Sequence, residues 1–501
     1  MCQVLNAQHL LYEAQIGHHY GLPDELAIAS LTSVPAKALG MDHRIGYLRV
    51  GYDADVVIWD SYPLALGATP IQVFIDGIPL FDEKTAGRKL SKKVESQNVP
   101  LQREFDEVEA LSGNVKPFDL VKQDFIATGI KKAYLRGEDG LQTISTMNEP
   151  LTMVVRNGKM ECLSSSCHRE MQAAVADGVQ IQHLRNGYIL PGLTVPSPAL
   201  GLGEIGAERS TYDGFVPNSI DPTNSNNVPY AKDGLTFDGK HLERAQAAGI
   251  LNIITPPLSG GFLQGVSAAF KSGGKSVLEK GAVVQEEVAL HFAIGHDSRG
   301  GSTPSVSSQI ALLRKILVAS ANETDSIYGR AANGKIPLAI TAQNKDVIAH
   351  LLKLKSSLKD VAPINLVIIG GIESYLLAEE LSRAQVPVIL IPWRCQPEEW
   401  EYRHCLPGPP ISDKTSFQIL VEHGVKVALG AWDDGLVSTM YWEAAWAAKG
   451  TGLTEKDVVE LISTKVEEIA GIKWKDSADG GHVLFEGNPL DFGASVAAII
   501  S

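Results

Sequence analysis

The sequence predicts an α/β protein: a distorted (β/α)8 barrel with a small β-sandwich side domain, preceded by the C-terminal remnant of a second such unit. Between residues 194 and 476, short apolar segments alternate with amphipathic segments of helical length. Such alternation is typical of parallel sheets with right-handed crossovers. Residues 148–193 and 477–501 carry strand-like segments on either side. They predict a sandwich assembled from both ends of the barrel region.

A repeat shared by the two ends of the chain predicts the remnant. Residues 21–41, GLPDELAIASLTSVPAKALGM, align without a gap on residues 452–472, GLTEKDVVELISTKVEEIAGI, and residues 53–64 align on 479–490. Both copies predict an amphipathic helix, a short helix ending at glycine and a strand before a Pro-Leu turn. Chance similarity of two generic endings is the alternative. A duplication makes residues 1–83 the end of a first unit and residues 84–147 a charged linker.

In the barrel region, apolar runs and the turn residues that flank them predict the strands and helices in order. Strands are expected at residues 250–256, 288–294, 336–342, 366–370, 386–391 and 425–430. Helices are expected at residues 241–248, 306–320, 345–354, 374–383 and 415–422. For a region of this length a (β/α)8 barrel is favoured over an open doubly wound sheet. No glycine-rich phosphate fingerprint follows any of these segments.

Composition narrows the classes of partner. The formal net charge of -14 argues against nucleic-acid binding, which requires a basic surface. No apolar run is long enough to span a bilayer. A small molecule is therefore the expected partner, and a homodimer is compatible with the sequence. The first residues lack a basic region before an apolar core, which favours a cytoplasmic location, although any targeting segment upstream of Met1 would be missing.

The cysteines are odd in number and widely scattered, which favours a reducing compartment over a disulfide framework. They are Cys2, Cys162, Cys167, Cys395 and Cys405. Cys395 and Cys405 bracket a loop that contains His404. A zinc site there is disfavoured, because the spacing matches none of the usual zinc motifs.

Two segments carry a resemblance to a known family. Residues 33–60, SVPAKALGMDHRIGYLRVGYDADVVIWD, and residues 186–193, NGYILPGL, resemble the amidohydrolase superfamily, in particular its imidazolonepropionase-like and N-acetylglucosamine-6-phosphate-deacetylase-like branches. The resemblance implies a distorted barrel with a sandwich beside it. It also implies hydrolysis of a C–N bond in a cyclic amide, an amidine or an N-acetyl group. Zinc or another divalent metal would activate the water.

The positions at which such a family holds its metal are occupied by poor ligands. The resemblance places the first-strand His-x-His on Ser197 and Ala199, and the later histidines on Gln343 and Gly371. Serine is a weak zinc ligand, whereas alanine and glycine offer no side-chain donor. We therefore expect no metal cofactor in this copy.

The loop after the last expected strand keeps two carboxylates, Asp433 and Asp434. In an enzyme with an unusual site, either would act as general base, with His296, Asp297 and Glu373 as helpers. The alternative is a catalytically silent pseudo-hydrolase barrel that serves as a scaffold, a ligand-binding module or a dimerisation module. A truncated product of a longer protein is compatible with both. His291 is expected to be a packed strand residue.

Overall fold

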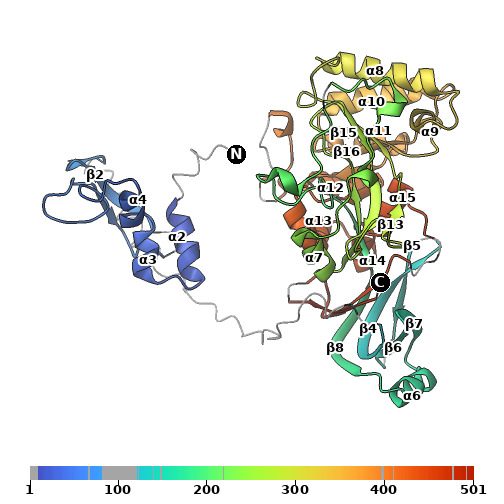
Figure 1. Cartoon of the computed structure of the whole chain (residues 1–501), viewed down its shortest axis with the longest axis horizontal. Coiled ribbons are helices and arrows are strands. Elements are labelled where there is room, and N and C mark those ends of the chain that lie inside the picture. Colours follow the sequence, from blue (N-terminus) through green and yellow to red (C-terminus); the bar gives the residue numbers. More distant parts are fainter. Residues whose placement is uncertain are drawn as a thin grey trace. The chain divides into compact units, whose positions relative to one another are not determined.

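A computed structural model describes residues 10–65, 68–81, 121, 123–138, 140–146, 149–217, 219–395, 400–409, 411–474, 476, 479–491 and 493–500. The chain divides into two compact units, Met1–Ala110 and Leu111–Ser501, which we call the N-unit and the C-unit (Figure 1).

Within its described residues, the N-unit contains three short helices and a three-stranded antiparallel sheet of order β1-β2-β3. The elements are α2 (Leu10–His19), α3 (Asp24–Ala29), α4 (Ser33–Ala38), β1 (Val56–Trp59), β2 (Pro70–Ile75) and β3 (Ile78–Pro79). Gly21 and Gly40 follow α2 and α4 with positive φ angles, as expected for residues that end helices. The buried core within the described residues is small and centres on Ala14, Ala27 and Leu64.

One end of the C-unit is a seven-stranded sheet of order β20-β19-β8-β4-β6-β7, with β5 paired to β4 (Figure 1). Its strands are β4 (Phe125–Gly137), β5 (Gly140–Ser145), β6 (Leu151–Arg156), β7 (Lys159–Ser164), β8 (Ile181–Pro191), β19 (His482–Glu486) and β20 (Ser495–Ile500). Helix α6 (His168–Ala176) connects β7 to β8. The sheet therefore contains strands from both ends of the unit. The two stacked sheets of the predicted sandwich are not confirmed.

The linker predicted at residues 84–147 is wrong for its last part. Residues 125–145 form β4 and β5, and Ile126, Ala127 and Ile130 of β4 are fully buried. Strand β4 was not predicted, because Lys131 and Lys132 interrupt its apolar pattern. Residues 84–120 lie outside the described part of the chain.

The α/β body contributes two further sheets. The first has the order β13-β12-β10-β9 and the second the order β11-β14-β15-β16-β17-β18. Their strands are β9 (Leu193–Pro196), β10 (Ile250–Thr255), β11 (Leu263–Val266), β12 (Ala268–Lys271), β13 (Val283–Gln285), β14 (Leu290–Ala293), β15 (Leu338–Ala342), β16 (Leu366–Gly370), β17 (Val388–Leu390) and β18 (Val427–Leu429). Neighbours from β14 to β18 run parallel, as predicted.

The predicted closed eight-stranded barrel is not confirmed, because the strands form two separate hydrogen-bonded ladders. Strands β11 and β12 run antiparallel to their neighbours β14 and β10, which a regular (β/α)8 barrel does not allow. A backbone bond nevertheless connects the edges of the ladders, and another extends the pairing of β11 with β14 to the start of β12. Ala431, beyond β18, donates to the carbonyl of Pro196 in β9 at 2.8 Å. Ser267, between β11 and β12, donates to the carbonyl of Ala289 at 3.0 Å.

Helices follow most strands of the α/β body. They are α7 (Lys240–Ala247), α8 (Val306–Ser320), α9 (Ile327–Ala332), α10 (Lys345–Leu358), α11 (Ala378–Arg383), α12 (Ser416–Glu422), α13 (Met440–Ala448), α14 (Glu455–Glu460) and α15 (Thr464–Ala470). Helix α8 has the predicted bounds, because Ser305 and Ser308 form a capping box at its start. In Figure 1, α8 and α10 lie at the opposite end of the C-unit from the seven-stranded sheet.

Four of the cysteines form two disulfides, Cys162–Cys167 and Cys395–Cys405. The expectation of reduced cysteines is therefore wrong in this structure, because residues five and ten apart come together across local turns. The sulfurs are bonded to one another, so they are not thiolate ligands for zinc. Cys2 lies outside the described residues.

A buried ion pair connects the seven-stranded sheet to the α/β body. Arg136 of β4 and Glu467 of α15 meet through two hydrogen bonds of 2.7 and 3.1 Å, and both side chains are almost fully buried. Arg136 also donates to the carbonyl of Gly192, just before β9. Thr194 of β9 donates to the same carboxylate.

In the described part of the chain, no helix combines the length and the apolar character needed to cross a membrane.

Candidate functional site

Ser197 and Asp434 come together at the carboxyl ends of the first and last strands of the α/β body. Ser197 follows β9, and Asp434 begins the 3-10 helix η8 (Asp434–Thr439) beyond β18. The Ser197 hydroxyl and the Ala199 backbone N–H both donate to Oδ1 of Asp434, the latter at 3.2 Å. Two positions predicted at the site are thus joined although they lie 237 residues apart.

Opposing effects act on the pKa of Asp434. Burial raises the pKa most strongly, and the negative charge of Asp433 raises it further. The hydrogen bonds from Ser197 and Ala199 lower it, but the net shift is upward. Burial wins because removing a carboxylate from water penalises its charged form.

The two carboxylates proposed as bases have different surroundings. Asp433 is exposed, and its side chain accepts a 2.8 Å hydrogen bond from the backbone N–H of Gly435. This contact makes Asp433 the N-cap of η8. Asp434 is half-buried and lies against Ser197. Of the two, Asp434 has the geometry of a site residue.

The remaining two ligand positions lie at the ends of β15 and β16. The side-chain oxygen of Gln343 accepts a hydrogen bond from the backbone N–H of Ile372 at 3.0 Å. Gly371 has φ +64°, and a Cβ there would lie 3.0 Å from Val388 and 3.2 Å from Ser374. Any larger residue at position 371 is therefore strained as well as crowded.

These donors do not fit a divalent metal. Asp434 provides a carboxylate, but one of its oxygens already accepts two hydrogen bonds. The Gln343 oxygen is similarly engaged, and Ala199 and Gly371 supply no side-chain donor. Zinc in catalytic sites needs three protein ligands, usually imidazole or carboxylate. No cluster of three such side chains was found among the residues that the structure describes.

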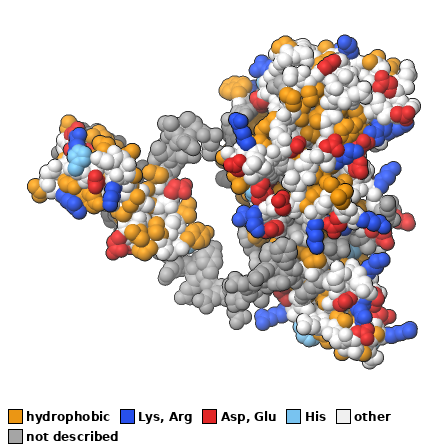
Figure 2. Space-filling model, viewed as in Figure 1, with side chains coloured by type: hydrophobic (Ala, Val, Ile, Leu, Met, Phe, Trp, Pro, Cys, Tyr) orange, Lys and Arg blue, Asp and Glu red, His pale blue; other side chains and the backbone are white. Residues whose placement is uncertain are grey.

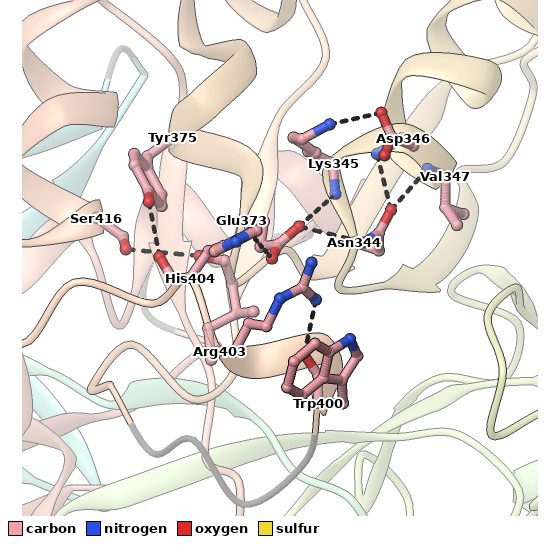
Figure 3. A network of polar contacts seen from close by, with 11 residues as sticks. Asn344, Lys345, Asp346, Val347, Glu373, Tyr375, Trp400, Arg403, His404 and Ser416 are labelled. Atoms are coloured by element: carbon pink, nitrogen blue, oxygen red, sulfur yellow. Dashed lines mark hydrogen bonds and ion pairs between the residues drawn. The ribbon is translucent and has the colours of Figure 1, made fainter.

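Glu373 forms a second polar cluster beyond β16 (Figure 3). Its fully buried carboxylate accepts from the Lys345 backbone N–H at 3.0 Å and from the Asn344 amide at 3.3 Å. Nδ1 of His404 lies 2.8 Å from its other oxygen. Asn344 caps α10, so this carboxylate sits at the N-terminus of that helix, where a negative charge is stabilised. The sequence indicated Glu373 as a helper but not His404 as its partner.

His296 and Asp297 lie in the exposed turn after β14. The His296 carbonyl accepts from the Arg299 guanidinium at 2.8 Å. His296 and Asp297 are exposed, whereas Asp434 is half-buried between two strand ends.

An apolar cavity of about 340 Å³ lies against Ser197 and is lined by residues of β10 and β14–β17. Most of its wall is aliphatic, including Ile254, Ala339, Val367, Ile369, Ile389 and Ile391. Its polar groups include Ser197, Gln264, Ser267, His291 and Thr341. None of the described residues that line it is acidic, lysine or arginine.

His291 provides the most distinctive polar contact in the cavity wall. Its Nε2 lies 2.8 Å from the Ser267 hydroxyl, and its side chain is 7% exposed. Burial lowers the pKa of His291 to about 4, so the ring is neutral at pH 7. The sequence indicated His291 as a packed strand residue, which agrees with its burial. It gave no signal for Ser267, because that serine joins two strands, β11 and β12, that were not predicted.

Parallel strands with candidate residues at their carboxyl ends, beside a β-sheet domain, define an α/β protein of the class that carries its sites at strand ends. The sequence model described as "Amidohydrolase family" matches residues 3–94. Amidohydrolase tasK of Hapsidospora irregularis is 30% identical over 523 residues, which cover 95% of this chain and 52% of that protein. The chain is thus similar to this amidohydrolase over almost its whole length. It spans about half the length of this curated relative.

One solved structure supports the fold. An amidohydrolase from Thermotoga maritima MSB8 matches with a TM-score of 0.59 and 18% identity, covering 75% of this chain and 99% of that one. A β-aspartyl dipeptidase from Fervidobacterium islandicum AW-1 matches at TM-score 0.42 and 13% identity, covering 76% and 95% of the two chains. The second likeness is too low to carry an argument.

Proposed function

We propose that the C-unit is an amidohydrolase-like domain that binds a small molecule without a catalytic metal. The observation that carries this proposal is the pairing of Asp434 with Ser197 and Ala199. These contacts use the retained carboxylate to hold two strand ends together. The apolar cavity next to Ser197 supports binding as the remaining role.

The two strand ladders of the α/β body are proposed to be arcs of one distorted barrel. After β9 and β10, the third strand position of this barrel would be taken by the bent segment formed by β11, Ser267 and β12. The bond from Ala431 to Pro196 supports this arrangement, since it connects the ladder edges formed by β18 and β9. The bond from Ser267 to Ala289 continues the pairing of β11 with β14 up to the start of β12. The cavity would then occupy the barrel interior.

The lining chemistry favours a neutral, mainly apolar ligand. Burying a charged group without a partner is strongly unfavourable, and the described lining residues offer neither an anion nor a permanent cation. The neutral imidazole of His291 and the Ser267 hydroxyl are placed to bind one hydroxyl or carbonyl group. A cavity of about 340 Å³ is within the size range of small-molecule sites.

The second candidate is hydrolysis of a non-peptide C–N bond, the activity that the family implies. In this chain Asp434 is the residue best placed to accept a proton, because it is half-buried with a raised pKa. A lone carboxylate would give only part of the required acceleration, since no positioned donor for the developing oxyanion accompanies it in our assignment. Activity of a longer protein would therefore depend on another part of that protein.

Metal analysis separates the two candidates. We expect purified protein to hold well under one equivalent of zinc, iron or manganese per chain, because Ser197, Ala199, Gln343 and Gly371 replace strong ligands. The measurement is inductively coupled plasma mass spectrometry after dialysis against metal-free buffer. One tightly held equivalent, lost in Asp434→Asn, would contradict the proposal and favour the hydrolase.

Filling the cavity is expected to abolish ligand binding. The neutral fluorophore N-phenyl-1-naphthylamine should bind with saturable 1:1 stoichiometry, and dodecanol should displace it better than dodecanoate. Ile369→Trp should weaken the fluorophore's affinity by at least about tenfold, because Ile369 lines the cavity and the larger ring occupies its space. Fluorescence titration measures both effects.

The matched control is Ile411→Trp, because Ile411 is 81% exposed. This variant should bind the fluorophore as the unmodified chain does. Equal losses in both variants, or equal competition by dodecanol and dodecanoate, would count against a cavity selective for neutral ligands.

A further inference from the structure

The N-unit repeats the C-terminal elements of the C-unit one by one. Helices α3 and α4 begin at Asp24 and Ser33, and helices α14 and α15 begin at Glu455 and Thr464. The offset is 431 residues in both cases, the same as in the ungapped sequence alignment. The residues before α4 and α15, Thr32 and Ser463, share an unusual backbone conformation with ψ of -88° and -105°.

The strand pairs correspond in register as well as in order. Val56 of β1 pairs with Phe74 of β2, and His482 of β19 pairs with Ile500 of β20, which is an offset of 426 residues on both strands. Both pairs are antiparallel. Their registers shift at equivalent places, between Ile58 and Trp59 in one pair and between Leu484 and Phe485 in the other.

Burial is the main difference between the two copies. Val57 and Ile58 of β1 are 42% and 46% exposed, whereas their counterparts Val483 and Leu484 are fully buried. Leu39, after α4, is 73% exposed. Figure 2 shows hydrophobic side chains spread over the visible face of the N-unit. An apolar surface of this kind on a small unit indicates an interaction site.

The C-unit shows which groups cover the equivalent surface. Strand β19 pairs with β8 on one edge and β20 on the other, whereas β1 lies at the end of the three-stranded sheet that the described residues form. The loop between α14 and α15 accepts backbone bonds from Thr194 of β9 and Leu429 of β18, at 2.9 and 3.1 Å. The equivalent loop of the N-unit joins α3 to α4.

A groove of about 910 Å³ occupies the corresponding face of the N-unit. Its walls come from α3, α4 and β1 and include Ile28, Leu31, Pro35, Leu39, Val56 and Tyr62. In the C-unit, the residues equivalent to Leu31 and Pro35 are Ile462 and Val466, and both are fully buried.

We propose that this face of the N-unit docks the part of an amidohydrolase-like unit that corresponds to the C-unit from β8 to β18. Such a partner supplies two neighbouring strand ends equivalent to β9 and β18, and an edge strand equivalent to β8 that pairs with β1. Strand pairing at an open edge satisfies backbone groups and sets the register. The relative tasK, of which this chain spans 52%, has enough additional chain to contain such a segment.

The test uses the full chain with an affinity tag, coexpressed with the part of tasK that lies outside its match to this chain. The two polypeptides should copurify. Hydrogen exchange at Val56–Trp59 should slow at least tenfold in the complex, because β1 gains a pairing strand. The double variant Val57→Glu, Ile58→Glu should lose the partner, since both side chains are already exposed in the free N-unit.

Leu278→Glu is the matched control, because Leu278 is a 92% exposed leucine of the C-unit. It should retain the partner. Circular dichroism checks that the variants remain folded. Failure of the wild-type chain to copurify the tasK segment overturns the proposal, as does equal retention by the double variant. A homodimer of the chain that the double variant abolishes would instead assign the face to self-association and also overturn it.

Discussion

Glu467→Ala is expected to lower the free energy of unfolding by about 3–5 kcal/mol, the usual cost of breaking a buried ion pair from one side. The side chains of Arg136 and Glu467 are 3% and 5% exposed. Among the described residues, removing the carboxylate leaves the buried guanidinium with the backbone carbonyls of Gly192 and Gly481 as its acceptors. It also removes the acceptor of the Thr194 hydroxyl. Urea unfolding followed by circular dichroism measures the loss.

The neighbouring residue provides a matched control. Glu468 pairs with Lys426 on the surface, and their side chains are 60% and 50% exposed. Exposed pairs contribute little because water screens them, so Glu468→Ala should change stability by less than about 1 kcal/mol. The double variant Arg136→Met, Glu467→Leu should recover much of the loss, since it leaves no unpaired charge. A loss below about 1 kcal/mol for Glu467→Ala would contradict a structural role for this pair.

The contact between the seven-stranded sheet and the α/β body illustrates what local sequence patterns predict and what they do not. Leu366–Gly370 and Val306–Ser320 have their predicted bounds, because an apolar run and a capped amphipathic segment are both local signals. Arg136 lies in β4, which carries charged residues and was assigned to a linker. Its burial depends on Glu467, 331 residues away. No local pattern indicates a contact of that separation.

The antiparallel segment formed by β11 and β12 was missed for a similar reason. Residues 263–271 are rich in small residues, and their direction is set by pairing with β14 and β10. Strand direction is a tertiary property, so alternation of apolar segments suggested parallel strands throughout. The disulfides also escaped prediction, since an odd cysteine count says nothing about which turns bring sulfurs together.

The candidate site was predictable to the extent that its residues follow strands. Ser197, Gln343, Gly371 and Asp434 all lie at the carboxyl ends of strands, where the resemblance placed them. The sequence did not indicate that Ser197 would bond to Asp434, nor that an apolar cavity would lie beside them. Both depend on the packing of strand interiors, where residues from several strands meet.

Acidification is expected to destabilise the C-unit between pH 6.5 and about 4 through two buried histidines. Burial lowers the pKa of His291 to about 4, and burial together with the charge of Arg136 lowers the pKa of His482 to about 4. In the unfolded chain each histidine has a pKa near 6.5. Below that pH the unfolded state binds more protons than the folded state, so stability falls as the pH falls. Above pH 6.5 neither group contributes to the pH dependence.

The expected loss is about 3 kcal/mol for each histidine across this window, since one pKa unit corresponds to about 1.4 kcal/mol. Urea unfolding of the C-unit transition at pH 7.5, 6.5, 5.5 and 4.5 measures it. The double variant His291→Gln, His482→Gln should flatten the slope between pH 6.5 and 4.5, whatever its stability at pH 7.5. His168→Gln is the control, because His168 is exposed on α6 and its replacement should leave the slope unchanged. An unaltered slope in the double variant would show that other groups drive the acid transition.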